Sequence, residues 1–408
     1  MKKDESTFVG IDIGSTKVAC VVGLHQEGSA MPSIIGVGLS PTTGLRRGVV
    51  ADLEETVSSI TAALEEAERM SGVAIDKATI SVDGAHIQSL NSRGVIAVSG
   101  PDHKITREDL ARAEDAAAAI NLDNNREIMQ LIPRNYIVDG QTNVVDPEGM
   151  HGVRLEIDTH IITVTAPAVK NLNNVITRSG VSPNGFVVVP LASAKAILTK
   201  RQKELGVAVV DIGGETTGLA VYQEGNISYT SILPIGSTYI TKDLVYGLRT
   251  NIDIAEKIKL KYGRAAKPKA KSTDQINLEE FGSTGKSLRS EIDTIISSRC
   301  EEIFSMIGVE LKKAGKDSML SAGVVLTGGG SKLDGMADFA KDILKLPVSI
   351  GKPSGFTGIV DKINDPSLAC AIGLMLEDME NPQDRGRVNK SINKIIHRIK
   401  SVFKSFMP

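Results

Sequence analysis

Two segments of this chain, 199 positions apart, share one pattern. Residues 8–22 read FVGIDIGSTKVACVV, and residues 207–222 read VAVVDIGGETTGLAVY. Each consists of an apolar strand ending in Asp-Ile-Gly, a short polar turn and a second apolar strand, and the second turn is one residue longer. One copy could be an ordinary hairpin loop. Two copies indicate a duplicated fold, so we expect two similar α/β domains that face each other.

The two turns have the composition of a phosphate-binding site. Their backbone N–H groups and hydroxyls can donate hydrogen bonds to phosphate oxygens, and glycine allows a close approach. Asp12 and Asp211, at the strand ends, can hold a hydrated Mg²⁺ whose other ligands are water and phosphate. We therefore expect the phosphates of a nucleotide to lie between the two hairpins.

A third glycine-rich element, GVVLTGGGSKLDGM at 323–336, predicts a buried strand, a turn at Gly328–Ser331 and a helix that begins near Leu333. Alone, it could be a strand-to-helix turn with an N-cap serine. As the third part of an ordered set, its glycines remove the bulk that would block a flat base.

Composition predicts a globular protein of two or more domains, because 408 residues with 41% hydrophobic side chains can bury sizeable cores. The charged start, Met1–Phe8, does not resemble a signal peptide, and no apolar run approaches a transmembrane length. We therefore expect a cytoplasmic protein. Cys20, Cys300 and Cys370 are expected to be buried free thiols. The six histidines show no metal-ligand spacing, so a protein-held zinc or iron site is not expected.

The last residues, 388–407, predict a basic amphipathic helix, because apolar residues recur every three or four positions. The expected membrane-facing and lipid-binding residues are Ile392, Ile395, Ile396, Ile399, Val402, Phe403, Phe406, Lys394, Arg398 and Lys404. Such a helix cannot span a bilayer but can lie in its interface. Alternatively, it packs on its own body or on a partner. Without the seven bases after Asp384, 40 basic residues face 49 acidic ones, which argues against nucleic-acid binding.

The order of these elements resembles the actin-like ATPase superfamily, in which two helices form a hinge. Val189–Leu198 (VPLASAKAIL) and Asp365–Leu376 (DPSLACAIGLML) match those helices, and their small residues permit a close crossing. Within the superfamily, the whole chain resembles the FtsA family of bacterial cell-division proteins. The segments that carry this resemblance are DPEGMHGVRL at Asp146–Leu155, PLASA at Pro190–Ala194, AEKIK at Ala255–Lys259, SRCEEIF at Ser298–Phe304, VVLTGGGSKL, and the basic amphipathic terminus.

The resemblance implies an α/β, actin-like two-lobed fold of duplicated ribonuclease H-like domains, with an inserted subdomain 1C and a C-terminal amphipathic helix. The implied parts are subdomain 1A at 1–83, 165–204 and 365–377; subdomain 1C at 84–164; subdomain 2A at 205–232 and 305–364; subdomain 2B at 233–304; a linker at 378–387; and the terminal helix at 388–407. Within 1C, we expect strands at Arg93–Val98 and Leu155–Thr165 and a helix around Arg107–Ile120.

The resemblance also implies ATP and Mg²⁺ as cofactors. The implied nucleotide contacts are Asp12, Gly14, Ser15, Thr16, Lys17, Asp211, Gly213, Gly214, Thr216, Thr217, Gly236, Glu256, Lys259, Gly329, Gly330 and Ser331. Without the resemblance, Glu256 and Lys259 would be taken for an exposed helix face. Active relatives place Glu or Gln just before the position of Pro190 to orient the attacking water. This chain has Val189 there, so we expect nucleotide binding with at most slow hydrolysis.

FtsA-like proteins polymerise, bind the C-terminal peptide of FtsZ, recruit late division proteins and sit on the cytoplasmic face of the membrane. The implied FtsZ-binding residues are Lys286, Arg289, Arg299 and Glu302, each of which could equally lie on a solvated helix. A positive cluster there would suit an acidic peptide. The alternatives are an actin-like adaptor of pilus assembly, a chaperone-type ATPase and a sugar kinase. The basic terminus disfavours the pilus adaptor. The short region after the second hinge helix disfavours the chaperone, and the missing sugar-binding cluster disfavours the sugar kinase.

Overall fold

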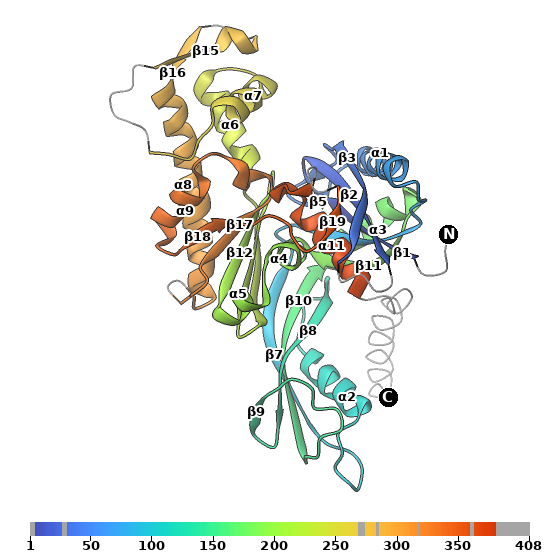
Figure 1. Ribbon diagram of the computed structural model, residues 1–408. Coiled ribbons are helices and arrows are strands. Elements are labelled where there is room, and N and C mark those ends of the chain that lie inside the picture. Colours follow the sequence, from blue (N-terminus) through green and yellow to red (C-terminus); the bar gives the residue numbers. More distant parts are fainter. Residues whose placement is uncertain are drawn as a thin grey trace.

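The computed structural model describes residues 5–26, 31–267, 274–282, 285–316, 319–359 and 363–380. The expected membrane helix at 388–407 and most of the linker before it lie outside these residues. The described chain forms two lobes joined by a pair of helices, with a third subdomain projecting below them (Figure 1).

The first lobe is built on a six-stranded sheet with the order β11-β6-β1-β2-β3-β19. Its strands are β1 (Glu5–Ile13), β2 (Lys17–Gln26), β3 (Ser33–Pro41), β6 (Lys77–Val82), β11 (Ser182–Val188) and β19 (Thr357–Gly358). Helix α1 (Leu53–Ser71) packs on β2 and β3 and also contacts α3 (Ala166–Arg178). A small hairpin of β4 (Leu45–Arg46) and β5 (Val49–Val50) follows β3.

The second lobe repeats the hairpin of the first. Its sheet has the order β14-β13-β12-β17-β18. Strand β12 pairs antiparallel with β13 and parallel with β17, just as β1 pairs antiparallel with β2 and parallel with β6. The strands are β12 (Val207–Ile212), β13 (Thr217–Gln223), β14 (Asn226–Leu233), β17 (Val324–Thr327) and β18 (Val348–Ile350). The duplicated fold predicted from the two Asp-Ile-Gly segments is therefore confirmed.

Helices cover the second lobe and extend it upward in Figure 1. They are α5 (Lys200–Leu205), α6 (Ser237–Leu248), α7 (Ile252–Tyr262), α8 (Arg289–Lys313) and α9 (Met336–Leu344). A small hairpin, β15 (Gln275–Asn277) and β16 (Lys286–Leu288), with the 3₁₀ turn η1 (Leu278–Phe281), lies near α7 and α8. One hydrophobic core joins this region to the sheet, and Phe304 of α8 is its largest fully buried side chain.

The projecting subdomain is a four-stranded sheet with the order β7-β10-β8-β9, packed against one helix. Its elements are β7 (Gln88–Ala97), α2 (Arg107–Ala118), β8 (Arg126–Val138), β9 (Gln141–Val144) and β10 (Arg154–Thr165). Helix α2 begins at a capping box, because Thr106 and Asp109 each accept a hydrogen bond from the other's backbone N–H. The strands and the helix expected in this segment are thus present.

Two helices cross between the lobes, as expected. They are α4 (Val189–Ile197) and α11 (Ala369–Glu380), which follows the 3₁₀ turn η3 (Pro366–Leu368). The crossing is so close that a Cβ atom on Gly373 would lie 1.8 Å from the carbonyl oxygen of Ala192. Only glycine fits there.

The helix expected near Leu333 begins later, at Met336. Residues Gly329–Lys332 instead form one 3₁₀ turn, η2. The intervening chain runs beside residues 264–265, where Ala265 N donates to the carbonyl oxygen of Asp334. Gly335, with φ +73°, then turns the chain into α9.

The three cysteines are buried free thiols, as predicted. Burial raises the pKa of each thiol, that of Cys300 to about 12. In the part of the chain that the structure describes, no helix has the length and apolarity needed to cross a bilayer.

Candidate functional site

The two hairpins and the third glycine-rich element meet in one cleft between the lobes. An inner cavity of about 110 Å³ opens beside an outer one of about 790 Å³, and both are lined by Ser15, Thr16, Lys17 and Gly329. Of the predicted nucleotide contacts, the inner cavity is also lined by Asp12, Gly14, Asp211, Gly213, Gly214 and Thr216, and the outer one by Glu256, Lys259 and Gly330. The structure thus brings together residues more than 300 positions apart.

Three predicted contacts lie behind the wall of the cleft. The hydroxyl of Thr217 donates to the carbonyl oxygen of Ile235 at 2.7 Å. The hydroxyl of Ser331 donates to the carbonyl oxygen of Gly328, also at 2.7 Å. Gly236 packs on the second hairpin, where an added Cβ would lie 2.6 Å from the oxygen of Gly214. These residues support the shape of the cleft.

Both hairpin turns close in the same way. Gly14 N donates to the oxygen of Lys17 at 3.0 Å, and Gly213 N donates to the oxygen of Thr216 at 2.9 Å. The two turns nearly touch, because a Cβ on Gly214 would lie 2.5 Å from Cγ2 of Thr16. A phosphate chain between the turns would therefore contact both lobes at once.

Three carboxyl groups line the inner cavity: the buried Asp83 and Asp211 and the half-buried Asp12. Of these, Asp83 was not predicted. Burial raises the pKa of all three, that of Asp83 to about 6 and that of Asp211 to about 7, and repulsion from neighbouring carboxylates adds to the effect for Asp83 and Asp211. Hydrogen bonds hold two of them: Ser193 donates to Asp211, and Thr216 donates to Asp83, each at 2.5 Å. A divalent cation in the cavity would relieve this repulsion.

Strand order explains why Asp83 lies in the cleft. Strands β11, β6 and β1 run parallel as neighbours, so their carboxyl ends meet at one edge of the sheet. The residues at that edge are Val189 after β11, Asp83 after β6 and Asp12 near the end of β1. All three line the inner cavity. Nothing near Asp83 in the sequence repeats the hairpin pattern, so only the sheet topology reveals it.

Lys17 reaches across the cleft to the hinge. Its Nζ donates to the carbonyl oxygen and the hydroxyl of Ser367, both at 2.8 Å. Burial lowers the pKa of Lys17, although Asp12 and Asp365 oppose this effect. Lys17 therefore ties the first hairpin to the turn that leads into α11.

In the outer cavity, Glu256 and Lys259 form one unit with Thr241. Thr241 donates to Glu256 at 2.5 Å, and Lys259 Nζ lies 2.9 Å from the Thr241 hydroxyl and 2.7 Å from Glu256. Lys259 is only 9% exposed. The interpretation as an ordinary exposed helix face is therefore wrong for Lys259, which is held rigidly in the cavity wall.

The β4–β5 hairpin bridges the lobes at the mouth of the cleft, and sequence patterns gave no sign of this. Arg47 N donates to Glu215 at 2.8 Å, and Arg47 Nε donates to the hydroxyl of Tyr239 at 3.1 Å. Gly48 N donates to the hydroxyl of Ser15 at 3.1 Å. This loop thus joins the first phosphate hairpin to the second lobe.

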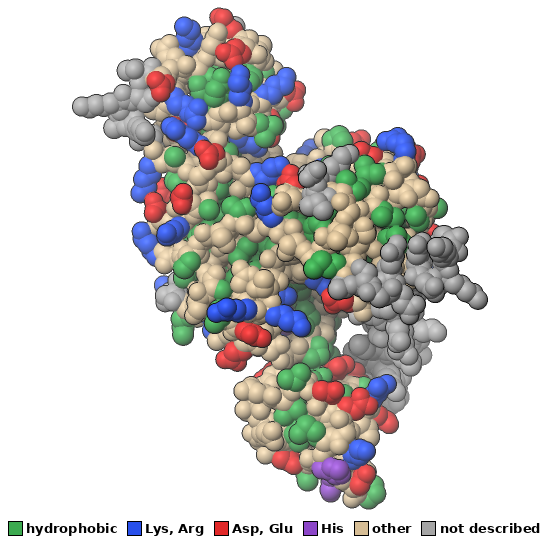
Figure 2. Space-filling model, in the orientation of Figure 1, with side chains coloured by type: hydrophobic (Ala, Val, Ile, Leu, Met, Phe, Trp, Pro, Cys, Tyr) green, Lys and Arg blue, Asp and Glu red, His purple; other side chains and the backbone are tan. Residues whose placement is uncertain are grey.

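The four predicted FtsZ-binding residues are spread along one edge. Lys286 lies on β16, Arg289 begins α8, and Arg299 lies ten residues further along that helix, or about 15 Å. Arg299 is already bound bidentately to Asp243, at 2.6 and 2.9 Å, and pairs with Glu302. Figure 2 shows acidic and basic side chains interspersed over this lobe. These residues do not form an isolated positive patch.

Comparison with known proteins identifies the family. The family model "Cell division protein FtsA" matches residues 208–373, and the model "SHS2 domain inserted in FTSA" matches residues 84–163. The FtsA of Neisseria meningitidis serogroup B is 40% identical over 378 residues, covering 92% of this chain and 91% of that protein. The chain belongs to the FtsA family. Other FtsA relatives include that of Pseudomonas aeruginosa, 35% identical over 92% of this chain and 90% of that protein, and that of Escherichia coli K12, 31% identical over 98% and 97%.

Solved structures agree with an FtsA fold of the actin-like type. A PilM–PilN type IV pilus biogenesis complex aligns with a TM-score of 0.66 at 17% identity, over 91% of this chain and 98% of that one. MreB5 of Spiroplasma citri bound to ADP aligns with a TM-score of 0.54 at 16% identity, over 93% and 97%. At these identities the likeness shows the fold alone. The two-lobed α/β fold with an inserted subdomain is thus confirmed, and FtsA membership favours cell division over pilus assembly.

Proposed function

We propose that this cell-division protein binds ATP with Mg²⁺ in the interlobe cleft and links FtsZ filaments to the cytoplasmic face of the membrane. The observation that carries the proposal is the meeting of both Asp-Ile-Gly hairpins around one cavity. The ADP bound to the MreB5 relative supports a nucleotide as the ligand. FtsA membership supports FtsZ, late division proteins and other copies of the chain as partners.

The residues of the inner cavity fit a hydrated Mg²⁺ beside the phosphates. Asp12 and Asp211 face this cavity from opposite lobes. Burial raises the pKa of both carboxyls, and repulsion from Asp12 and Asp83 raises that of Asp211 further. Magnesium usually keeps several waters and binds through one or two carboxylates plus phosphate. When bound, it would neutralise charge on the phosphates, while Lys17 and the backbone N–H groups of the turns hold their oxygens.

Turnover in this cleft is expected to be slow. Val189 lines the cavity at the hinge position and cannot accept a proton. Asp83 is the nearby carboxyl group that could orient water, but its acceptor atoms already bind Thr216 and Gly84 N. Nucleotide binding would then act mainly by fixing the two lobes relative to each other.

The basic amphipathic segment at 388–407 would attach this body to anionic lipids. Polymerisation would set many such segments on one surface, where avidity makes weak individual binding firm. The acidic FtsZ peptide would bind on the 2B edge at Lys286, Arg289, Arg299 and Glu302. Because Arg299 is bound to Asp243, that peptide would have to compete for it or use its remaining donors.

Equilibrium binding of a fluorescent ATP analogue, with and without Mg²⁺, tests the cleft. Lys17→Ala removes a half-buried cation that would lie beside the phosphates, and it should weaken binding at least about tenfold, which corresponds to 1.4 kcal/mol. Lys77→Ala, at an exposed position, is the matched control. Equal affinity of both variants would contradict the cleft assignment. Co-sedimentation of FtsZ with anionic liposomes, dependent on this protein, tests the link to the membrane.

A further inference from the structure

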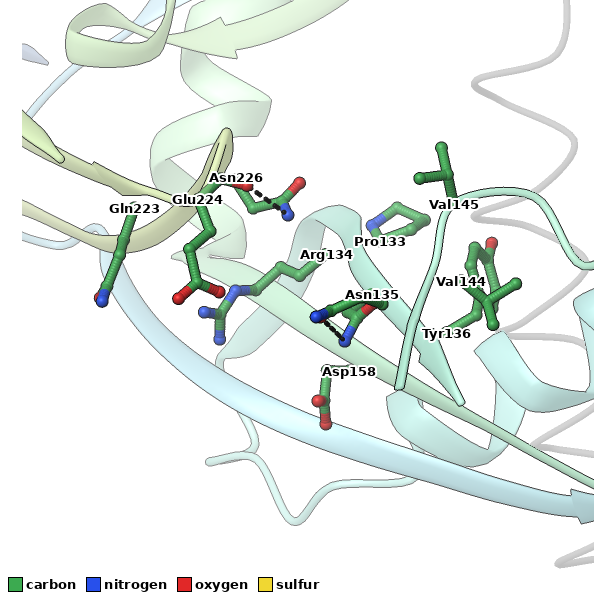
Figure 3. A pocket seen from close by; sticks show the side chains of 11 residues that line it. Pro133, Arg134, Asn135, Tyr136, Val144, Val145, Asp158, Gln223, Glu224 and Asn226 are labelled. Atoms are coloured by element: carbon green, nitrogen blue, oxygen red, sulfur yellow. Dashed lines mark hydrogen bonds between the residues drawn. The ribbon is translucent and has the colours of Figure 1, made fainter. Parts of the chain in front are cut away.

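A second pocket lies away from the cleft, where the projecting subdomain meets the second lobe (Figure 3). This junction pocket has a volume of about 590 Å³. One wall comes from β8, β10 and the end of β9, and the other comes from the turn between β13 and β14. It is lined by Pro133, Arg134, Asn135, Tyr136, Asn143, Val144, Val145, Asp158, Gln223, Glu224 and Asn226.

Arg134 enters the junction pocket because of a β-bulge. Strand β8 pairs with β10 through Pro133 and Thr159 and then through Asn135 and Asp158, which leaves Arg134 as an extra residue between them. Bulges redirect side chains in this way and often occur beside functional sites. Arg134 Nε is buried and has no hydrogen-bond partner. A buried N–H without an acceptor is costly, so a ligand that supplies an acceptor would be favoured.

Glu224 lies on the opposite wall, at the tip of the two-residue turn between β13 and β14. Its φ of +52° and that of Gly225, +81°, are those of a type I′ hairpin. Figure 3 shows its carboxylate turned toward Arg134. Among the described residues no ion pair joins the two. Asp158, in contrast, is already bound to Arg93 at 2.7 and 3.1 Å.

The rest of the lining suits a peptide backbone. Four side-chain amides line the pocket: Asn135, Asn143, Gln223 and Asn226. Asn135 Nδ2 already donates to Asn143 Oδ1, and Asn226 Nδ2 to the carbonyl oxygen of Glu224, each at 3.3 Å, so a peptide backbone would use the remaining donors and acceptors. The apolar surfaces of Pro133 and Val145 border them, and Val145 is 92% exposed. Two facing charges of opposite sign that form no ion pair favour a ligand that carries both signs, rather than a simple anion.

The pocket is preformed because its two walls are fixed to each other. Ser89 donates to the oxygen of Thr230 at 2.7 Å, and Asn91 Nδ2 donates to the oxygen of Ser228 at 3.1 Å. The His160 ring bridges Asn91 and Thr230, at 2.8 and 3.0 Å. Burial lowers the pKa of His160 to about 4, so this bridge stays neutral at physiological pH. Binding a ligand would therefore require little free energy to order the walls.

We propose that the junction pocket binds an extended peptide segment in which an acidic side chain lies close to a basic one. The carboxylate pairs with Arg134, the cation pairs with Glu224, and the amides bind the backbone between them. This site is separate from the cleft and from the proposed FtsZ-binding edge, so it would add a partner of mixed charge to the protein.

Peptide titrations of the ¹⁵N-labelled full-length protein, followed by NMR, test this pairing. The parent probe is acetyl-Lys-Gly-Asp-amide. In a second peptide Asn replaces the Asp, and in a third Gln replaces the Lys. The wild type should bind the parent peptide about tenfold more tightly than either analogue, since each replacement removes a charge-assisted hydrogen bond. The first preference is for Asp over Asn, and the second is for Lys over Gln. Arg134→Gln should abolish only the first preference, and Glu224→Gln only the second.

Arg107→Gln is the matched control, because it removes an exposed charge from the same subdomain. It should leave both preferences intact, and ATP affinity measured on every sample should not change, which separates this proposal from that for the cleft. If Arg134→Gln does not fold, Arg134→Lys should still reduce the Asp preference. Equal binding of all peptides, saturation by sodium acetate alone, or preferences that survive in Arg134→Gln would overturn the proposal.

Discussion

At the scale of single residues, Asp83 is the carboxyl group beside Val189 that could orient a water in the inner cavity. It lies between Val189 and Asp12 on the edge of the first sheet and lines the inner cavity. Its raised pKa, about 6 because of burial, would leave it mostly ionised at pH 7 and able to accept a proton from water. We expect Asp83 to contribute to the slow hydrolysis, although its oxygens already accept hydrogen bonds from Thr216 and Gly84 N.

Asp83→Asn should lower the single-turnover rate of phosphate release from ATP by about tenfold or more, because a positioned base typically contributes 10²–10⁴. Affinity for ATP should stay within about threefold, since the amide can keep the hydrogen bond with Thr216. Asp76→Asn, at an exposed position, is the control. An unchanged rate in Asp83→Asn would show that Asp12, Asp211 or bound water suffices.

Asp211 should make the nucleotide-free protein less stable as pH rises. Its folded pKa of about 7 exceeds the ordinary value of 3.8, so the folded state holds this proton between those values and the unfolded state does not. The stabilisation is complete below about pH 4 and is lost as pH rises through 7. Denaturant unfolding at pH 5 and pH 7.5 should show this loss, on the order of 2–4 kcal/mol, in the wild type. Asp211→Asn should reduce it, and an identical pH dependence in that variant would refute the assignment.

Residues that repeat a local pattern could be predicted from the sequence, whereas those placed by tertiary contacts could not. The two Asp-Ile-Gly turns carry their chemistry in adjacent positions, so both were found. Asp83 reaches the cleft only because β6 lies beside β1, and Arg47 only because its loop meets the second lobe. Conversely, Thr217 matches the family pattern, but its hydroxyl donates to the carbonyl oxygen of Ile235 and does not line the cleft.

At the scale of elements, the crossing of α4 and α11 fixes the position of the two lobes relative to each other. Small residues at this crossing let the backbones approach. Gly10 of β1 faces α11 just as closely, since an added Cβ would lie 2.3 Å from the oxygen of Ala371. Helix α11 is therefore clamped between the first sheet and α4, and a change in its position would move both lobes.

Gly373→Val should destabilise the protein by roughly 3 kcal/mol or more, because overpacking where no side chain can relax commonly costs 1–3 kcal/mol. The clash is with the backbone oxygen of Ala192, which cannot move without shifting α4. Thermal unfolding with and without ATP would measure it. Gly308→Ala, in α8, is the control: its Cβ meets only Leu344, at 3.7 Å, and alanine favours a helix. Equal effects of both changes would mean that the crossing is looser than described.

At the scale of the whole molecule, the proposed attachment to the membrane requires the two-lobed body and the terminal segment to act together. Each basic residue near an anionic surface contributes about 1 kcal/mol, and burying an Ile or Phe side chain contributes about 1.5–3 kcal/mol. Ordering the helix offsets part of this gain. One copy should then attach reversibly, while a filament that carries many copies should stay attached.

Replacing Ile399 and Phe403 together with Glu should release the protein from anionic liposomes in flotation while ATP affinity stays unchanged. In the helix expected from the sequence, at 100° per residue, both would fall on the apolar stripe, whereas Asn393 and Ser401 would fall outside it. Replacing Asn393 and Ser401 with Glu adds the same negative charge without disturbing the stripe, so that variant should retain most binding. Equal release of both variants would mean that charge alone holds the protein on the membrane. Binding that does not rise steeply with protein concentration would contradict anchoring through assembly, because independent tails gain nothing from their neighbours.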